Sequence, residues 1–218
     1  MVLILNFKTY EESSGSKSIE CARAAYEFSK NSSHTVIICA AITDIKELLG
    51  LFPQSDRFKI WSQHVDPNDG DKNTGFVTVK MLKEIGVSGS LVNHAEHKVN
   101  EISKYTTIDD NIDLCFCISD FFELTLALTK NPDFVPKYIA YEPPSLIGGN
   151  VSVSTASPYE IENIVEKFSN YEVLVGAGVK TKTDVQTALK IGAQGILISS
   201  GFVLAEDKFK FLQELTSL

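Results

Sequence analysis

Short apolar runs alternate with amphipathic segments along the whole chain, and this alternation constrains the fold more than any other feature. The unit repeats about eight times, at about 27 residues each, as expected of strand–helix units. The runs are uniformly apolar, which indicates parallel strands covered by helices. The apolar runs are Val2–Phe7, Thr35–Ala40, Phe58–Trp61, Gly89–Asn93, Ile112–Cys117, Tyr138–Tyr141, Glu172–Gly176 and Gly195–Ile198, and clear amphipathic segments are Ser18–Ser29, Val79–Ile85, Pro158–Phe168 and Lys182–Ile191.

Such a sheet can be arranged in two ways, as an open doubly wound sheet or as a closed barrel. The count and the even spacing of the runs favour the barrel. Neither a linker nor a shift in composition divides the chain, so we expect one domain over residues 1–218. The predicted fold is therefore α/β, a single-domain (β/α)8 barrel with its active site at the C-terminal rim of the strands.

Charge and composition exclude several classes of function. Lys plus Arg number 20 against 28 Asp plus Glu, a net charge of −8 with no basic block, so we expect no nucleic-acid partner. No apolar run approaches the length of a membrane span, so we expect no membrane partner either. Cys21, Cys39, Cys115 and Cys117 lie in apolar runs or on a helix face, which indicates a reduced, cytoplasmic protein. Without a second Cys pair, Cys115-Phe116-Cys117 is a weak metal signal.

Nearly every apolar run ends in a side chain or a turn that is capable of chemistry. In a barrel these ends meet at one rim, where active sites are built. An open sheet would instead gather its polar ends near one switch point. The residues at these ends are Asn6, Lys8, Gln63, His64, Asn93, His94, Glu142, Gly176 and Ser199.

The stretch from Tyr138 to Gly149 joins an acid to a possible lid. Glu142 follows a short apolar run, so we expect its carboxylate at the rim of the barrel, next to buried apolar residues that exclude water. The two prolines after it are expected to prevent a helix from starting at once and to stiffen the segment. This pattern fits a catalytic carboxylate with a lid, and it also fits a capped strand end before a loop. The segment after the acid is Pro143-Pro144-Ser145-Leu146-Ile147-Gly148-Gly149.

His94 lies where an apolar run is expected to enter a helix. The positive end of a helix disfavours imidazolium and would hold the ring neutral, able to donate a hydrogen bond to a carbonyl oxygen. Glu96 would then lie in the first helical turn, where an acid is favoured. A metal interpretation also exists, because His94-Ala95-Glu96 fits half of a zinc deaminase motif, but the Cys half of that motif is absent.

Asn6 and Lys8 end the first run two residues apart, on the same side of the strand. A lysine there can hold a phosphate or an oxyanion as a point charge. The alternative is a surface lysine that follows a strand.

Two small-residue turns follow the last two runs. Gly176-Ala177-Gly178 and Ser199-Ser200-Gly201 each come after a strand and before an expected helix. Backbone amides of two such turns can form a phosphate site.

The segment Val65–Gly75 is long and polar. Loops of this length are unusual unless they are functional or disordered. The composition fits a partner-binding projection and a mobile surface loop equally well.

Taken together, these motifs resemble the triosephosphate isomerase family over essentially the whole chain and in the same order. The short length and the Asn-His-x-Glu-His and Gly-Ala-Gly patterns resemble the archaeal type of that family. The matching residues are Asn6-Phe7-Lys8, Asn93-His94-Ala95-Glu96-His97, Tyr141-Glu142-Pro143-Pro144 with Ile147-Gly148, Gly176-Ala177-Gly178, and Gly195 to Gly201.

The resemblance implies a TIM barrel that interconverts dihydroxyacetone phosphate and D-glyceraldehyde 3-phosphate through an enediolate, without cofactor and without metal. It implies that Glu142 is the base, that His94 is a neutral electrophile and that Lys8 is a catalytic cation. The implied substrate-binding residues are Asn6, Lys8, Ile147, Gly148, Gly176, Ala177, Gly178, Ser199 and Ser200, supported by Glu96 and Thr74.

Thr74-Gly75 resembles the family's loop tip that enters the active site of a neighbouring subunit. We therefore expect a homo-oligomer, with a dimer favoured and a tetramer left open. The sequence departs from the family pattern at two places, and it does not determine how they affect closure of the lid. Ala95 stands where the family commonly has Ser, and Gly149-Asn150 replaces Thr-Gly.

Two other classes of function remain as alternatives. Another phosphate-binding barrel isomerase would share the phosphate turns but need not combine His94, Lys8 and Glu142. A sugar-phosphate sensor would keep the turns and lose the base.

Overall fold

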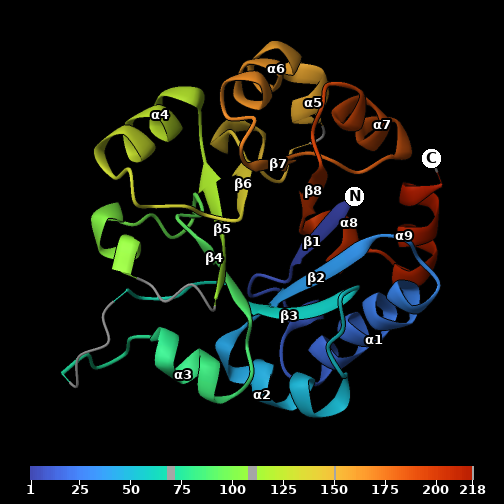
Figure 1. The fold of residues 1–218 in the computed structure, drawn as a ribbon. Helices are drawn as coiled ribbons and strands as arrows, with labels where there is room; N and C mark the ends of the chain where they lie inside the picture. Colours follow the sequence, from blue (N-terminus) through green and yellow to red (C-terminus); the bar gives the residue numbers. More distant parts are fainter. Residues whose placement is uncertain (68–71, 108–111, 150, 218) are drawn as a thin grey trace.

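The computed structural model describes residues 1–67, 72–107, 112–149 and 151–217. Each of its eight strands pairs in parallel with the next, and β8 pairs with β1 to close a barrel (Figure 1). The predicted closed barrel is confirmed, and the open sheet is wrong. The strands are β1 (Val2–Asn6), β2 (Thr35–Ala40), β3 (Phe58–Ser62), β4 (Gly89–Val92), β5 (Asp113–Ile118), β6 (Tyr138–Tyr141), β7 (Glu172–Val175) and β8 (Gly195–Ile198).

Helices surround the ring of strands (Figure 1), and the eight apolar runs and four amphipathic segments named above begin and end within two residues of observed strands and helices. N-capping side chains explain where three of the helices begin. Each accepts a hydrogen bond from a backbone amide of the first helical turn; they are Asp120, Thr181 and Asp207. The α-helices are α1 (Ser16–Lys30), α2 (Ile42–Leu51), α3 (Val79–Glu84), α4 (Phe121–Lys130), α5 (Val153–Ala156), α6 (Pro158–Lys167), α7 (Lys182–Lys190), α8 (Ser200–Val203) and α9 (Lys208–Thr216), and the 3-10 helices are η1 (Glu11–Ser13), η2 (Ile102–Thr107) and η3 (Pro144–Leu146).

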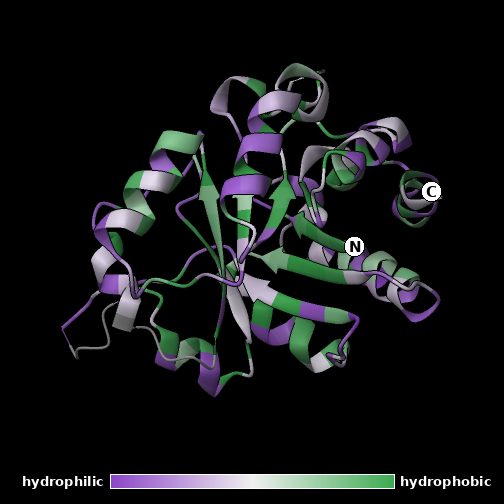
Figure 2. Cartoon of the chain, turned by 45° about the horizontal axis from the view of Figure 1, so that its top comes forward, coloured by the Kyte–Doolittle hydropathy of each residue, from purple (hydrophilic) through white to green (hydrophobic). Residues whose placement is uncertain are grey.

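Alternate side chains of each strand enter two separate cores. In β1, Val2 and Ile4 belong to the core inside the barrel, whereas Leu3 and Leu5 belong to the core between strands and helices. Figure 2 shows the consequence, with apolar strands at the centre and hydrophilic residues on the outer parts of the helices. Burial on both faces explains why the strands read as continuous apolar runs rather than as alternating ones.

One predicted helix is absent. The sequence predicts that β4 runs into a helix at His94, but residues 93–101 contain only turns and bends, and the next element is η2. His97 N–H donates to His94 O over 2.8 Å, which closes one turn that is not continued. His94 and Glu96 therefore lie on a loop, and the helix-dipole argument for His94 is wrong.

No helix in the described part of the chain is both long and apolar enough to cross a membrane. We propose that residues 1–218 form one domain, because β1 and β8 come from opposite ends of the sequence and pair in one barrel.

Trp61 fills part of the barrel interior and requires glycine opposite it. Its side chain is fully buried, and its ring lies 5.9 Å from that of Tyr138 between centroids. A Cβ at Gly89 would lie 2.1 Å from Trp61 Cε2, far inside contact distance. Gly89 on β4 thus leaves the space that the indole of Trp61, on the neighbouring strand β3, occupies.

We expect Gly89→Ala to lower the free energy of unfolding by about 1–3 kcal/mol, because the added methyl overpacks a closed core. Urea unfolding measures the change. Gly50→Ala is the control, since nothing lies within 4 Å of a Cβ there and alanine suits a helix better than glycine. If both variants unfold at the same urea concentration, packing of the Trp61 indole does not require glycine at position 89.

Candidate active site

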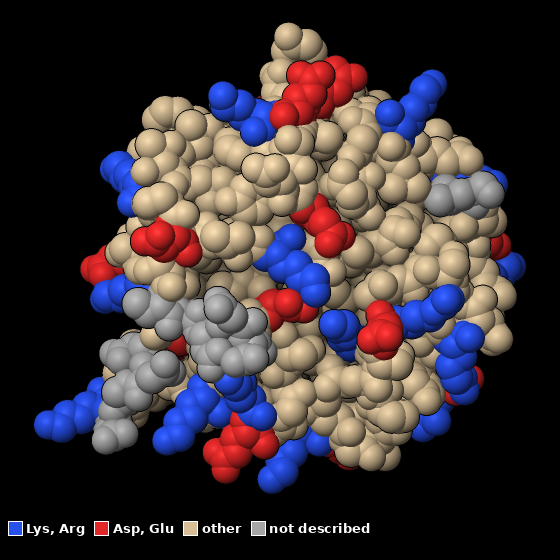
Figure 3. Space-filling view, viewed as in Figure 1, with Lys and Arg blue, Asp and Glu red and all other residues tan. Residues whose placement is uncertain are grey.

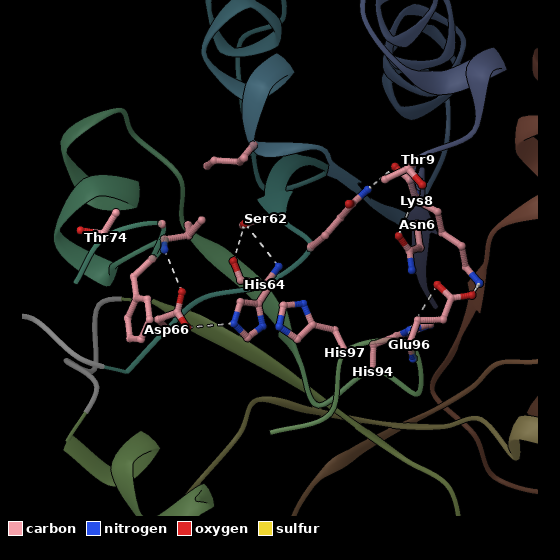
Figure 4. A pocket seen from close by; sticks show the side chains of 15 residues that line it. Asn6, Lys8, Thr9, Ser62, His64, Asp66, Thr74, His94, Glu96 and His97 are labelled. Atoms are coloured by element: carbon pink, nitrogen blue, oxygen red, sulfur yellow. Dashed lines mark hydrogen bonds and ion pairs between the residues drawn. The ribbon is translucent and has the colours of Figure 1, made fainter. Parts of the chain in front are cut away.

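The predicted catalytic side chains meet at the C-terminal ends of three strands. Glu142 follows β6, His94 follows β4 and Lys8 follows β1. Figure 3 shows acidic and basic side chains close together at the centre of one face of the molecule, and Figure 4 shows Lys8, His94 and Glu96 converging. Residues separated by more than a hundred positions are thus brought to one rim.

The Glu142 carboxyl is held in a dry position by the sheet behind it. Its backbone N–H donates to Ile118 O over 2.8 Å, and the residue is only 5% exposed. Burial raises the pKa of this carboxyl to about 7, although the Lys8 ammonium acts in the opposite direction. Atom Oε2 has no hydrogen-bond partner. Glu142 is therefore a carboxyl whose proton can come and go near neutral pH.

Gly176 provides the space in which Glu142 lies. A Cβ at this position would lie 2.5 Å from Glu142 Cγ and 2.6 Å from Oε1. Its N–H donates to Tyr141 O over 2.9 Å, which fixes the two strand ends together. The sequence predicts Gly176 as part of the phosphate cradle, and that remains a prediction. Its contact with Glu142 is a feature that the sequence did not indicate.

His94 is neutral, and one of its ring nitrogens lies near Glu142. Burial lowers the pKa of the imidazole to about 4, and the Lys8 ammonium acts in the same direction. The Glu96 N–H donates to Nδ1 over 3.2 Å, so Nδ1 carries the lone pair and Nε2 carries the proton. Nε2 has no hydrogen-bond partner and lies 3.7 Å from Glu142 Oε2. Because His94 charges only at a pH where Glu142 is already protonated, this close pair is not an ion pair.

Lys8 is fixed by three contacts around the end of β1. Its Nζ donates to Glu96 Oε1 over 2.6 Å, and its N–H donates to Asn6 Oδ1 over 3.1 Å. The Gln63 amide donates to Lys8 O over 2.9 Å. The backbone of Lys8 is left-handed, with φ of 48°, which turns the chain sharply at the strand end. Asn6 and Glu96 thus support Lys8, and Gln63 adds a contact without a predicted role.

A small cavity of about 40 Å³ lies beside Glu142. The backbone is left-handed at Gly148, Ala177 and Gly178, as in turns whose amides point inward. A Cβ at Gly178 would lie 2.0 Å from Val151 O, so only glycine fits there. The walls are formed by Lys8, Tyr10, Glu142, Ile147, Gly148, Gly149, Ala177, Gly178, Val179, Lys180, Leu197, Ile198, Ser199, Ser200 and Gly201.

Ser199 contributes an unsatisfied hydroxyl to this cavity. It occupies the N-cap of α8, yet its side chain makes no cap hydrogen bond, and Oγ is buried without a partner. Among the described residues, four buried side-chain polar atoms lack partners. Three of them, on His94, Glu142 and Ser199, lie at this rim, and the fourth is Trp61 Nε1 in the barrel. Orphaned polar atoms are rare in folded proteins, so their concentration here indicates the place of a polar ligand.

The segment after Glu142 begins with a turn that the sequence did not predict. Pro143 and Pro144 were expected to prevent a helix, but η3 starts at Pro144, since the first helical position needs no N–H donor. Ile147 and the two glycines after it reach the small cavity, whereas Leu146 packs against the outer core. Asn150, one of the two departures from the family pattern, lies outside the described residues.

A second, more open cavity of about 480 Å³ adjoins the first at Lys8. It is lined by residues of the same rim, by Thr74 and Gly75 of the long polar segment, and by Phe76 that follows it (Figure 4). His64 and His97 stack in its wall with ring centroids 3.9 Å apart, and His64 Nε2 lies 3.3 Å from Asp66 Oδ1. Part of the predicted Val65–Gly75 loop, residues 68–71, lies outside the described residues.

In residues 1–67, 72–107, 112–149 and 151–217, no three His, Cys, Asp or Glu side chains lie close enough together to hold a metal ion.

A sequence model of the triosephosphate isomerase family matches residues 1–119 and 116–215 of the chain. The triosephosphate isomerase of Methanothermus fervidus is 34% identical over 223 residues, which cover 98% of this chain and 96% of that protein. The triosephosphate isomerase of Thermoplasma volcanium is 37% identical over 215 residues, 98% of each chain. The crystal structure of triosephosphate isomerase from Bartonella henselae has a similar fold, with a TM-score of 0.74, 18% identity and 97% of each chain covered.

We expect Gly176→Ala to lower kcat by about 100-fold, because the methyl occupies the place of the Glu142 carboxylate and displaces it from its substrate. The same substitution in a Glu142→Asp background should have a much smaller effect, since the shorter side chain leaves room. Steady-state kinetics of the four proteins in this cycle measure the coupling. Equal losses in both backgrounds would contradict a steric contact with the base.

Proposed function

The chain belongs to the triosephosphate isomerase family, and on that premise we propose how its residues divide the reaction. The activity is the interconversion of dihydroxyacetone phosphate and D-glyceraldehyde 3-phosphate, a step of glycolysis and gluconeogenesis. The observation that best supports the residue roles is the pair of buried, unpartnered atoms, Glu142 Oε2 and His94 Nε2, 3.7 Å apart.

Glu142 is the base that moves a proton between adjacent carbons. Its carboxylate removes a proton from C1 of the ketose and returns it to C2, while the proton of the C1 hydroxyl passes to the oxygen on C2, so no net proton is consumed. A base is most effective when its pKa lies near the working pH, and the raised pKa of Glu142 satisfies this condition.

His94 is the electrophile in this assignment. Its Nε2–H donates to the substrate oxygens as negative charge develops on them in the enediolate. A neutral donor suits this task because it remains uncharged through the cycle, a pairing with a glutamate base that is well known for this enzyme family. The Lys8 ammonium supplies the positive charge that stabilises the enediolate, which matters in a protein of net charge −8.

The phosphate of the substrate fits the small cavity. Gly148, Ala177 and Gly178 bring backbone amides to its wall, and Ser199 and Ser200 begin α8 there. Ile147 supplies apolar cover at the same wall. The cavity adjoins Glu142, so a phosphate held in it leaves the carbons of the substrate next to the base.

We further propose a cytoplasmic location and a homo-oligomer. All four cysteines are buried and unpaired, as is common in a reducing compartment. The open cavity exposes Ile42 and Phe76, each 41% exposed, beside Lys8 and His94. The exposed tip Thr74-Gly75 of a second copy is a fitting occupant, which favours a dimer and leaves a tetramer open.

A coupled assay on the triose phosphates tests the assignment of the base. We expect Glu142→Gln to lower kcat by about 10²- to 10⁴-fold while inorganic phosphate still binds, because the amide cannot accept the proton. If turnover stays within tenfold of the original protein, another residue is the base.

The same substitution should change the pH dependence of stability. The folded pKa of Glu142 lies above its unfolded value, so below pH 4.5 the carboxyl is neutral in both states, and above about pH 7 folding must bury its charge. Glu142→Gln should therefore stabilise the fold by about 3 kcal/mol at pH 8 and hardly at all at pH 4. Urea unfolding at the two pH values measures this; a gain that is equal at both would contradict a buried charge.

Ser199→Ala should weaken the affinity for inorganic phosphate about 10-fold, since one hydrogen bond to a charged group is lost. Isomerisation of unphosphorylated glyceraldehyde should be unchanged, because Ser199 does not contact the reacting carbons. Ser90→Ala is the control, as it removes a buried hydroxyl that already donates to Leu91 O over 2.8 Å. Phosphate binding that is equal in both variants would exclude Ser199 from the cradle.

Phe76→Glu should shift the oligomer toward monomers and lower kcat, because a charge on the loop beside the open cavity opposes docking of a second copy. Sedimentation at assay concentration measures the state. Phe122→Glu, at an aromatic side chain of α4 that is 73% exposed, should leave the assembly intact. A fully active monomer of the unchanged protein would contradict the proposal.

A further inference from the structure

Asn93, the residue before His94, binds its surroundings through every polar group of its side chain. Nδ2 donates to Cys117 O over 2.8 Å and to Glu123 Oε1 over 2.9 Å. Oδ1 accepts the Val99 N–H over 3.1 Å. The backbone is left-handed, with φ of 63°, a conformation that asparagine adopts more readily than most residues. The loop that carries His94 is thereby tied at both ends to one carboxamide.

Glu123, in the first turn of α4, accepts hydrogen bonds from three different residues. Lys98 Nζ donates to its two oxygens over 2.7 and 3.0 Å, and the Ser119 N–H donates to Oε2 over 2.7 Å. The third donor is Asn93. Burial opposes the charge, yet these donors hold the pKa of Glu123 below its ordinary value. Every partner is a donor, so only a carboxylate satisfies all of them.

The loop has little support of its own. Its one turn, from His97 N–H to His94 O, is not continued into a helix. Within the loop the Glu96 N–H binds His94 Nδ1, so the place of both residues at the rim depends on contacts that hold the loop from outside. Lys98 and Asn93 lie on the two sides of His94 in sequence, and both bind Glu123. Glu96, the partner of Lys8, lies between them on the same loop.

We propose that Glu123 is a positioning residue that holds the loop 93–98 and thereby directs His94 Nε2 at the substrate. The proposal rests on the role of His94 given above. Glu123 does not line the catalytic cavities and acts through Asn93 and Lys98. The alternative is that Glu123 and Lys98 form an ordinary surface ion pair, which would contribute little.

The chain offers a matched control at the opposite end of β5. Lys137 and Asp113 form an ion pair of 2.7 Å with side chains 37% and 28% exposed. Lys98 and Glu123 form one of 2.7 Å with side chains 37% and 26% exposed. Asp113 begins β5 and also pairs with Lys59 at 3.8 Å, whereas Glu123 follows the C-terminal end of β5 and also binds Asn93, so only the second pair is connected to the loop of His94.

Glu123→Gln tests the proposal, with Asp113→Asn beside it. We expect Glu123→Gln to lower kcat about 10-fold or more, because small misplacements of a catalytic group slow the reaction strongly. Affinity for inorganic phosphate should stay within twofold, while affinity for a hydroxamate analogue of the enediolate falls in step with kcat/KM. Asp113→Asn should leave all three quantities unchanged. Equal effects of the two variants would reduce Glu123 to a structural ion pair and overturn the proposal.

Asn93→Gly provides a second test that does not disturb the backbone, since glycine accepts a positive φ. It should reproduce the kinetic loss of Glu123→Gln, and the double variant should be no slower than either single one, because the two residues act as a unit. Additive losses, or wild-type kcat in both single variants, would overturn the proposal. His94→Gln separates the role of His94 from the positioning role of Glu123. If His94→Gln retains full turnover, both roles fail together. If it is inactive while Glu123→Gln is fully active, only the positioning role of Glu123 fails.

Discussion

The site depends on a carboxyl group that is kept out of water and given no hydrogen-bond partner on Oε2. Burial makes the charged form of Glu142 costly, and the same dry surroundings make the charged form of His94 costly. The two pKa values therefore exchange their usual order, to about 7 for Glu142 and about 4 for His94, so the groups lie 3.7 Å from each other without both being charged at any pH. A base and a neutral donor are thus available together near neutral pH.

The barrel maintains this arrangement by bending its backbone sharply at the strand ends. Among the described residues, three that are not glycine have positive φ: Lys8, Asn93 and Ala177. They follow β1, β4 and β7 by one or two residues, and all three lie at the catalytic rim. Such conformations cost about 1–3 kcal/mol each and persist only where the surrounding structure fixes them. Hydrogen bonds with Asn6 and Gln63 fix Lys8, and hydrogen bonds with Cys117 and Glu123 fix Asn93. Ala177 O accepts the Val153 N–H over 3.1 Å. Stability is thus given up locally to shape the rim.

Sequence reasoning located the candidate residues of the rim better than it explained their physical properties. Neutral His94 was expected from a helix dipole, but the loop there contains no helix, and burial with Lys8 lowers the pKa instead. Gly176 was expected at the phosphate, yet its missing side chain makes room for Glu142 on the neighbouring strand. Glu123 was not identified at all. Its place in a helical turn gave no sign of the hydrogen-bond donors that converge on it from the loop after β4 and from the residue after β5.

The sequence by itself determined the alternation of strands and helices, the order of the polar strand ends, and the identities of Glu142, His94 and Lys8 as candidates. These depend on local properties: apolar runs long enough to be buried on both faces, and the residue that ends each run. Only the tertiary structure decided which strand ends face one another, how dry Glu142 is, and which hydrogen-bond donors and acceptors remain unpaired. Closure of the barrel sets these features, because pKa shifts and unsatisfied hydrogen bonds arise from neighbours that are distant in sequence and meet only when β8 pairs with β1.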